Sequence, residues 1–264
     1  MVVLVVGASS GIGHAVSLLA AVEGHHVVVA ARSEDKLAEL AAECLRRGAM
    51  STEVVTCDVR DDASVAALVQ TTVDRHGVLD AVLHCSGVVT YGRVEDTGAA
   101  DFESVLSTNL LGAAAVARHV VPVLRRQGRG SLVLVGSLLG HIAIPEMTPY
   151  VVSKWGVRAL ARQLVIENLD RPGVHICHVA PGSVDTGIYG KALDGAGGVN
   201  TAPPPVISPE RAAQVVLDQI GGSRAAVQTQ LTNYLLIAAF RGAGPVWDRL
   251  VGPVFDRVSR GRTG

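Results

Sequence analysis

Short apolar blocks alternate along the chain with longer amphipathic blocks. The apolar blocks are continuous runs of Val, Leu and Ala, which is typical of strands buried on both faces of a parallel sheet. They cover residues 2–6, 26–31, 51–57, 79–85, 131–137 and 174–180. The pattern therefore predicts six βα repeats and an α/β fold, with a doubly wound, Rossmann-like parallel sheet between two layers of helices.

The blocks between the strands repeat apolar residues at helical spacing. They predict helices over 14–24, 35–47, 65–77, 101–126, 149–170 and 210–220. The segment 35–47 shows the reasoning: acidic residues lead it, arginines close it and Gly48 follows, as the helix dipole and a glycine C-cap both favour.

The last third of the chain departs from this alternation. Residues 182–209 are rich in Gly and Pro and too long for an ordinary connection, so we expect a substrate lid there. Residues 228–264 form a C-terminal extension that contains the run YLLIAAF (234–240) and two similar eight-residue segments in tandem, GPVWDRLV and GPVFDRVS. Each copy predicts a short helix with an apolar face, formed by Val246, Trp247 and Leu250, then by Val254, Phe255 and Val258. We expect residues 1–264 to form one domain.

Composition excludes several classes of protein. The 264 residues have a formal charge of −1 and only 3% aromatic residues, which argues against a nucleic-acid partner. No apolar run approaches the ~20 residues of a membrane span, and the strand at residue 2 leaves no room for a targeting segment. We therefore expect a cytoplasmic protein. The four cysteines lack disulfide or zinc spacing, and HICH (175–178) fits a strand better than a metal site, so no metal is expected.

The first strand is followed by a glycine-rich turn, GASSGIG (7–13). In a doubly wound sheet this turn meets the phosphates of a dinucleotide. Gly7 would permit the tight turn, Gly11 would let the backbone approach the pyrophosphate, and Gly13 would let the helix pack on the strand. The helix N-terminus supplies amide donors, and Ser9 and Ser10 can add hydroxyl groups.

Several motifs then occur in order: the glycine turn, CDV (57–59), STNLLG around Asn109, Ser137, YVVSK (150–154) and PGSVDT (181–186). With these motifs, residues 2–186 resemble the short-chain dehydrogenase/reductase family, the single-domain branch with an Asn-Ser-Tyr-Lys tetrad. Ser137 precedes Tyr150 by thirteen positions, and Lys154 follows Tyr150 by four, which makes the resemblance specific.

The residues themselves support oxidoreductase chemistry. Tyr150 and Lys154 share one face of the predicted helix. A phenol has a pKa near ~10, but a neighbouring ammonium and an oxidised nicotinamide both favour the phenolate. Tyr150 is therefore the expected general acid for ketone reduction, or general base for alcohol oxidation. Ser137 would hydrogen-bond the substrate oxygen. The resemblance implies that Lys154 holds the nicotinamide ribose and that Asn109 supports a water-mediated proton relay. Each residue type also occurs for structural reasons alone, and it is their combination that favours catalysis.

The end of the second strand bears on the choice of cofactor. Ala31 stands where an NAD enzyme places an acid, and Arg32 follows, as suits the 2′-phosphate of NADP(H), so NAD(H) is the less favoured cofactor. The alternative to 2′-phosphate binding is that Arg32 is simply a solvent-exposed residue at the start of the next helix. The resemblance implies that Asp58 contacts the adenine, whereas its structural alternative is to cap the following helix. The expected cofactor-binding residues are Gly7, Ser9, Ser10, Gly11, Ile12, Gly13, Arg32, Asp58, Val59, Cys85, Ser86, Gly87, Tyr150, Lys154, Pro181, Gly182, Val184 and Thr186.

One motif departs from the family. After the fourth strand the family carries Asn-Asn-Ala-Gly, and this chain has His84, Cys85, Ser86 and Gly87. Gly87 still permits close approach to a cofactor. Cys85 is either a reactive thiol near the cofactor or, as is usual for free cysteines, a small buried residue.

The residues expected around the reacting centre are apolar: Val88, Val89, Leu138, Leu139, Ile142, Ile144, Ile188 and Tyr189. They predict an NADP(H)-dependent enzyme acting on a lipophilic ketone, aldehyde or secondary alcohol. The alternatives are a sugar-nucleotide epimerase or dehydratase and a non-catalytic NADP(H)-binding sensor or scaffold. The run 234–240 would complete the pocket, pack an interface or touch a membrane surface, with packing favoured. The resemblance implies a homodimer or homotetramer formed through the helices that contain Asn109 and Tyr150.

Overall fold

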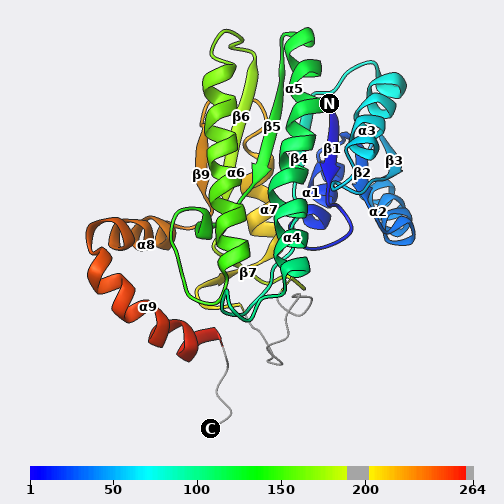
Figure 1. The fold of residues 1–264 in the computed structure, drawn as a ribbon. Helices are drawn as coiled ribbons and strands as arrows, with labels where there is room; N and C mark the ends of the chain where they lie inside the picture. The colour runs from blue at the N-terminus through cyan, green and yellow to red at the C-terminus, as the bar shows by residue number, and fades with distance from the viewer. Residues whose placement is uncertain (189–201, 260–264) are drawn as a thin grey trace.

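Seven parallel strands form the central sheet of the computed structural model, which describes residues 1–188 and 202–259 (Figure 1). The strands lie in the order β3-β2-β1-β4-β5-β6-β9. Their bounds are β1 Val2–Val6, β2 His26–Ala31, β3 Ser51–Thr56, β4 Ala81–His84, β5 Gly130–Val135, β6 Val174–Ala180 and β9 Ala226–Gln228. The doubly wound parallel sheet predicted from the sequence is thus confirmed, with one further strand, β9, that the sequence pattern did not predict.

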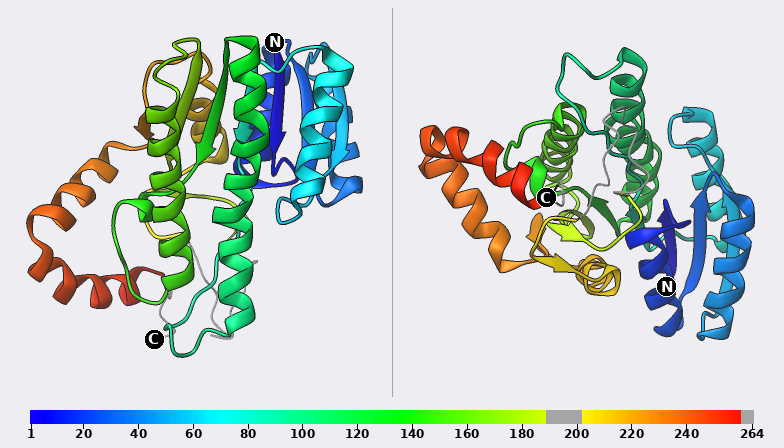
Figure 2. Two further views of the ribbon diagram at one scale, coloured as in Figure 1. Left: turned by 45° about the horizontal axis from the view of Figure 1, so that its top comes forward. Right: turned by 90° about the horizontal axis from the view of Figure 1, so that it is seen from below.

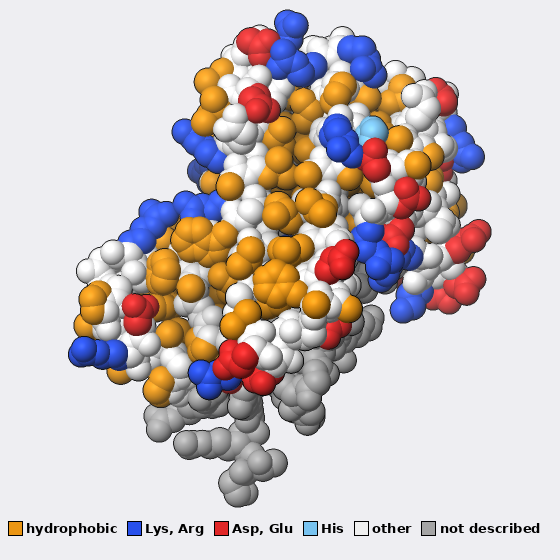
Figure 3. Space-filling model, in the orientation of Figure 1, with side chains coloured by type: hydrophobic (Ala, Val, Ile, Leu, Met, Phe, Trp, Pro, Cys, Tyr) orange, Lys and Arg blue, Asp and Glu red, His pale blue; other side chains and the backbone are white. Residues whose placement is uncertain are grey.

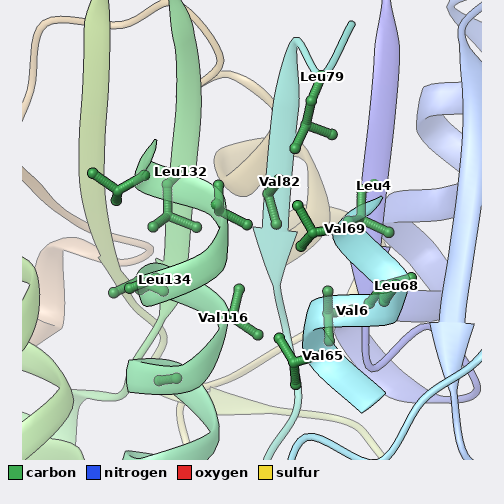
Figure 4. Close-up of a cluster of buried hydrophobic side chains, with 14 of the residues drawn as sticks. Leu4, Val6, Val65, Leu68, Val69, Leu79, Val82, Val116, Leu132 and Leu134 are labelled. Carbon is green, nitrogen blue, oxygen red and sulfur yellow. The ribbon is translucent and has the colours of Figure 1, made fainter. Parts of the chain in front are cut away.

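Helices cover both faces of the sheet (Figure 2). Alternate residues of β1 divide between two cores: Val3 and Val5 pack on one face, while Leu4 and Val6 pack on the other (Figure 4). The first face is covered by α1 (Gly11–Val22), α2 (Glu34–Arg46) and α7 (Pro209–Leu217). The second is covered by α3 (Asp62–His76), α5 (Gly112–Gln127) and α6 (Thr148–Glu167). The inner strands β1, β2, β4 and β5 are buried on both sides, which explains their largely apolar runs, whereas the edge strand β3 is only partly buried.

The strand order reverses between β1 and β4. The chain steps outward from β1 to β3, returns to the centre at β4 and then continues to β6 on the other side. The loops after β1 and β4 therefore diverge at the carboxyl edge of the sheet and leave a crevice, which is where ligands bind in folds of this type.

The long helix expected over 101–126 is interrupted. Instead of one α-helix the chain forms α4 (Ala99–Leu106), a π-helical turn η1 (Ser107–Leu111) and α5. The turn centres on the buried Asn109, whose side chain bonds the backbone of Val88 through both its oxygen and its nitrogen. These two bonds hold Asn109 against the segment after β4. A widened turn of this kind is typical of functional positions in helices.

After β6, a small parallel pair, β7 (Ser183–Val184) and β8 (Val206–Ile207), brackets the expected lid. The centre of that lid, including Tyr189, lies outside the described residues. Beyond β9, α8 (Leu231–Gly242) and α9 (Gly244–Ser259) form an arm that leaves the edge of the sheet and folds back toward the loop before α6 (Figures 1 and 2).

The prediction of two short helices in the tandem segments of residues 244–259 was wrong, because they form one helix. Pro253 lies inside α9, and the helix continues through it. Trp247, Val251 and Phe255 line a cavity against the body of the protein, on both sides of the proline in the sequence. Val246, Leu250 and Val254, expected on the apolar faces, are each more than half exposed, and the side chain of Val258 lies outside the described residues. Among the described helices, none is long and apolar enough to cross a membrane.

Candidate active site

The glycine turn after β1 has the backbone that the sequence suggested. Gly7 has φ +87° and Gly11 has φ +57°, both in the region that favours glycine. A Cβ on Gly7 would lie 2.6 Å from the amide nitrogen of Ser86, and one on Gly13 would collide with the carbonyl oxygen of Gly7. Gly7 thus allows the turn to approach the segment after β4, and Gly13 allows α1 to pack against the turn.

The N-terminus of α1 is available to a ligand. The residue that precedes the helix, Ser10, makes no side-chain capping bond, and the first turn of α1 contains no acidic residue. Amide donors and the positive end of the helix dipole therefore face the cleft without a protein anion to compete for them.

The turn opens into a cleft of about 510 Å³ along the carboxyl edge of the sheet. Most of the expected cofactor residues line it: Gly7, Ser9, Ser10, Gly11, Ile12, Arg32, Asp58, Val59, Cys85, Ser86, Gly87 and Thr186. Gly13 lies beneath the turn. Five further expected residues do not line this cleft: Pro181, Gly182, Val184, Tyr150 and Lys154. Gly182 and Tyr150 line a neighbouring cavity, Val184 is buried, and Lys154 is buried beside Gly87.

One end of the cleft is positively charged. Arg32 lines it, and so does Lys36, one helical turn further on in α2, which the sequence analysis missed. Asp58 lies nearby, but its carboxylate is bound by Arg60 through an Nη2–Oδ2 contact of 2.6 Å and by the Arg60 amide. The Arg60 hydrogen bond holds the pKa of Asp58 below its usual range. The structural alternative for Asp58 is wrong, because Asp61 caps α3 by accepting a hydrogen bond from the Ala63 amide.

Ser137, Tyr150 and Lys154 meet where β5 ends and α6 begins. The Nζ atom of Lys154 lies 5.6 Å from the centre of the Tyr150 ring and donates to the carbonyl oxygen of Val135 at 3.2 Å. Ser137 starts the short 3₁₀ turn η2 (Leu138–Gly140), and its hydroxyl accepts from the Leu139 amide at 3.1 Å.

Asn109 ties this cluster to the segment after β4. Its Oδ1 atom accepts from the Val88 amide at 2.8 Å, and its Nδ2 atom donates to the carbonyl oxygen of Val88 at 2.9 Å and to Ser153 Oγ at 3.0 Å. Ser153 in turn donates to the carbonyl oxygen of Tyr150 at 2.7 Å. The Asn109 side chain therefore connects Val88 in the cleft wall to the first turn of α6.

Lys154 is a buried cation with no carboxylate recorded beside it among the described residues. Burial lowers its pKa from 10.5 to about 8. The same environment lowers the pKa of His84 to about 3, through burial first and the Lys154 charge second. Burial raises the pKa of the Cys85 thiol to about 12. Cys85 is therefore a neutral thiol in the cleft wall, as expected of a packing cysteine and not of a reactive one.

A second cavity, of about 260 Å³, adjoins the cleft. Val89 and Ile188 line both spaces, while Ser137 and Tyr150 line only the second. Its other walls are mainly apolar and include the expected Leu138, Leu139, Ile142 and Ile144. Val88 lies in the cleft instead. The arm contributes Leu236, Trp247, Val251, Val254 and Phe255, so the C-terminal helices complete the pocket, one of the three alternatives for that segment.

The polar end of this second cavity was not predicted. Asn233 is buried, donates to Gln228 Oε1 at 3.1 Å and lines the cavity. The Gln228 side chain also contacts His141 Nε2 at 3.2 Å. Asn233 and Gln228 lie in α8 and β9, elements with weak sequence patterns, so nothing in the sequence linked them to Tyr150.

A parallel sheet with a glycine turn at its switch point is the Rossmann class of α/β proteins, in which dinucleotides bind across the carboxyl ends of the strands. Comparison with known proteins narrows this fold class to one family. The family model for short chain dehydrogenases matches residues 1–196. The chain belongs to the short-chain dehydrogenase family and is thus a member of a family of oxidoreductases.

Individual relatives agree with this assignment. The NADPH-dependent pterin aldehyde reductase of Arabidopsis thaliana is 30% identical over 202 residues, which cover 76% of this chain and 82% of the relative. An alcohol dehydrogenase from the archaeon Thermococcus sibiricus, solved with 5-hydroxy-NADP, superposes with a TM-score of 0.75 at 27% identity, covering 86% of this chain and 94% of that one. Actinorhodin polyketide ketoreductase, solved with NADPH, gives a TM-score of 0.77 at 28% identity over the same shares of the two chains.

Proposed function

We propose that this protein is an NADP(H)-dependent oxidoreductase that interconverts a lipophilic ketone or aldehyde and the corresponding alcohol. The observation that carries the proposal is the junction of the two spaces. A cleft with a glycine turn and two cations meets an apolar cavity at Val89 and Ile188, and the hydroxyl-bearing residues Ser137 and Tyr150 line the apolar side of that junction.

The cleft fits a phosphorylated dinucleotide. The uncapped N-terminus of α1 and the turn at Gly7 and Gly11 suit a pyrophosphate. Arg32 and Lys36 would bind the 2′-phosphate that distinguishes NADP from NAD. The NADPH in the names of the pterin reductase and the ketoreductase structure supports the same choice.

NADPH held in the cleft would supply the hydride that reduces the carbonyl carbon of the substrate. In our proposal Tyr150 donates its phenolic proton to the carbonyl oxygen, so that an alcohol forms, and water restores that proton. Ser137 donates a hydrogen bond to the same oxygen while negative charge develops on it. Lys154 favours the phenolate of Tyr150 between these steps. Asn109, which hydrogen-bonds Val88 and Ser153, holds the start of α6 against the cleft wall. The family resemblance further implies that Asn109 supports a water-mediated proton relay through Lys154.

The mainly apolar lining of the second cavity supports a lipophilic substrate. Its described walls contain neither Lys nor Arg to bind an anionic substrate, and the polar side chains that line it are fewer than the apolar ones. A substrate with an apolar body and one carbonyl group satisfies such a lining at the lowest desolvation cost.

The proposal is tested in two stages. Titration with NADPH and NADH, followed by the emission of Trp155 beside Lys154, should give much tighter binding of NADPH. A panel of lipophilic ketones and aldehydes should then be reduced by the wild type, and Tyr150→Phe should abolish turnover while NADPH binding remains. Cofactor binding without turnover of any carbonyl or alcohol would favour the sensor or scaffold alternative. Turnover of small hydrophilic sugars alone would refute the lipophilic substrate.

We also propose a homo-oligomer formed through α4–α5 and α6. Exposed apolar side chains on these helices support it: Leu111 is 59% exposed, Val152 46% and Ile166 48%. Sedimentation of the purified protein would test it, and a monomer at all concentrations would contradict it.

A further inference from the structure

The arm formed by α8 and α9 carries an apolar surface that the fold does not cover. We name it the outer stripe, and it comprises Leu231, Tyr234 and Leu235 in α8 and Val246 and Leu250 in α9. The positions in α8 follow the i, i+3, i+4 spacing of one helix face. Leu231 is 83% exposed and Leu235 72%, and the remaining three residues are each more than half exposed. Figure 3 shows apolar side chains over the arm, with basic residues along its edge.

The opposite face of the arm already accounts for its attachment to the protein. In α8, Phe240 packs edge-on against Trp155 of α6 and Trp247 of α9, with ring centres 6.3 and 5.6 Å apart. Trp247 donates from Nε1 to the carbonyl oxygen of Ala143 at 2.9 Å, and Phe255 is buried against the pocket. The outer stripe is therefore not needed to hold the arm in place. Exposed apolar patches of this kind mark interaction sites.

The charges on the arm favour an anionic partner. Residues 225–240 contain no charged side chain, whereas the rest of the arm, residues 241–259, contains three arginines and two aspartates, a net charge of +1 in a chain whose net charge is −1. Among the described side chains of the arm, Arg241 follows the uncharged run of α8, and Arg249 lies between Val246 and Leu250 with Asp248 beside it, so the cations exceed the anions by one. An uncharged apolar face combined with arginines is typical of helices that lie in the interface of an anionic bilayer.

The outer stripe is also continuous with the substrate cavity. Leu236 and Val254 line the cavity and are themselves 36% and 57% exposed. Apolar surface therefore extends from the outside of the arm to the space that contains Ser137 and Tyr150. A second copy of the chain seated on this surface would cover the entrance, whereas a bilayer would let a lipophilic molecule enter from the hydrocarbon phase.

We propose that the arm docks on the surface of an anionic lipid bilayer through the outer stripe, with the cavity opening toward the membrane. The exposed apolar surface and its net positive charge are independent of the proposed function, whereas the choice of a bilayer over a second copy also rests on it. Delivery of a lipophilic substrate through it rests on the proposed function.

The experiment is co-sedimentation of the full chain with vesicles of phosphatidylcholine, with or without phosphatidylglycerol. We expect the wild type to bind the anionic vesicles, and to bind less at high salt and to phosphatidylcholine alone. The double variant Leu231→Glu/Leu235→Glu should lower the partition coefficient by about tenfold or more, since each substitution removes one of the large apolar groups from the interface. Leu45→Glu is the matched control, because Leu45 is 52% exposed on α2, away from the arm, and it should bind as the wild type does.

Two results would overturn the proposal. One is a wild type that stays in the supernatant with anionic vesicles. The other is a double variant that binds vesicles normally but changes the oligomeric state on size-exclusion chromatography, since the outer stripe would then be an interface between two copies. Vesicle binding needs no turnover, so a failure of the proposed enzymatic function is recognised separately, in the carbonyl panel.

Discussion

Replacing Lys154 by Met should make the protein more stable at pH 7 while it abolishes activity. Lys154 is 4% exposed, and burial lowers its pKa from 10.5 to about 8. At 1.36 kcal/mol per pKa unit, keeping this ammonium protonated in the folded protein costs about 3 kcal/mol. Met is uncharged and fills irregular space. It loses the hydrogen bond to the carbonyl oxygen of Val135, at a cost of about 1 kcal/mol, so the expected gain is about 2 kcal/mol.

This gain should depend on pH in a defined direction. Between about pH 8 and pH 10.5 the unfolded chain keeps the Lys154 proton while the folded protein releases it. The free-energy cost that Lys154 imposes on folding therefore decreases as the pH rises through that window, and the wild type becomes more stable relative to the variant. The advantage of Lys154→Met is full below about pH 8 and disappears as the pH approaches 10.5.

The assay is thermal and urea unfolding of the cofactor-free proteins at several pH values. At pH 7 the variant should unfold at a temperature higher by about 2–4 °C for each kcal/mol gained. Lys36→Met is the matched control, because Lys36 is exposed and its replacement relieves no burial cost. A Lys154→Met protein that is less stable than the wild type at pH 7, or whose stability difference does not change with pH, would refute the reasoning.

Three other substitutions test separate parts of the site. Arg32→Ala should weaken NADPH binding far more than NADH binding, by about tenfold or more, with a smaller effect in the same direction for Lys36→Ala; equal losses for both cofactors in the fluorescence titration would exclude the 2′-phosphate role. Asn109→Leu should lower the melting temperature and weaken cofactor binding together, because it leaves both backbone groups of Val88 without their partner. Gly136→Ala should destabilise the protein by about 1–3 kcal/mol, because its Cβ would collide with the ring of His178. Adding His178→Ala should recover part of that loss. Strictly additive changes in the free energy of unfolding would show that the two sites do not interact.

The sequence predicted the sheet and the position of the site because both depend on local signals. Strands buried on both faces are apolar throughout, and the carboxyl ends of parallel strands meet at one edge. The glycine turn, Ser137 and Tyr150 therefore had to lie near one another. Lys36 had a detectable signal, since it lies one helical turn after Arg32 and an exposed helix position there faces the same end of the cleft.

Other features had no local signal. The π turn at Asn109 depends on hydrogen bonds to Val88, which lies 21 residues earlier in the chain. The strand β9 has only three residues, too few for a periodic pattern to be distinguished from a loop. The pattern predicted no helix over α8, and for α9 it predicted two short helices with apolar faces. Because α9 carries apolar residues on both faces, the pattern did not separate Trp247 and Phe255, which pack on the protein, from Val246 and Leu250, which are exposed.

The departure at residues 84–87 illustrates how a changed motif can leave its backbone unchanged. The amide of Cys85 donates to the carbonyl oxygen of Val6 at 2.8 Å, and Asn109 binds both backbone groups of Val88, so the segment is anchored on either side of the altered residues. The turn at Gly7 still approaches Ser86, and Gly87 leaves room beside Lys154 Nζ, where a Cβ would lie 3.5 Å away. His84 is fully buried and its lowered pKa keeps it neutral, so it adds no charge beside Lys154. The proposed cofactor needs the backbone of this segment and its glycine, Gly87. Both are held by contacts that do not involve the two asparagine side chains that the family carries and this chain lacks.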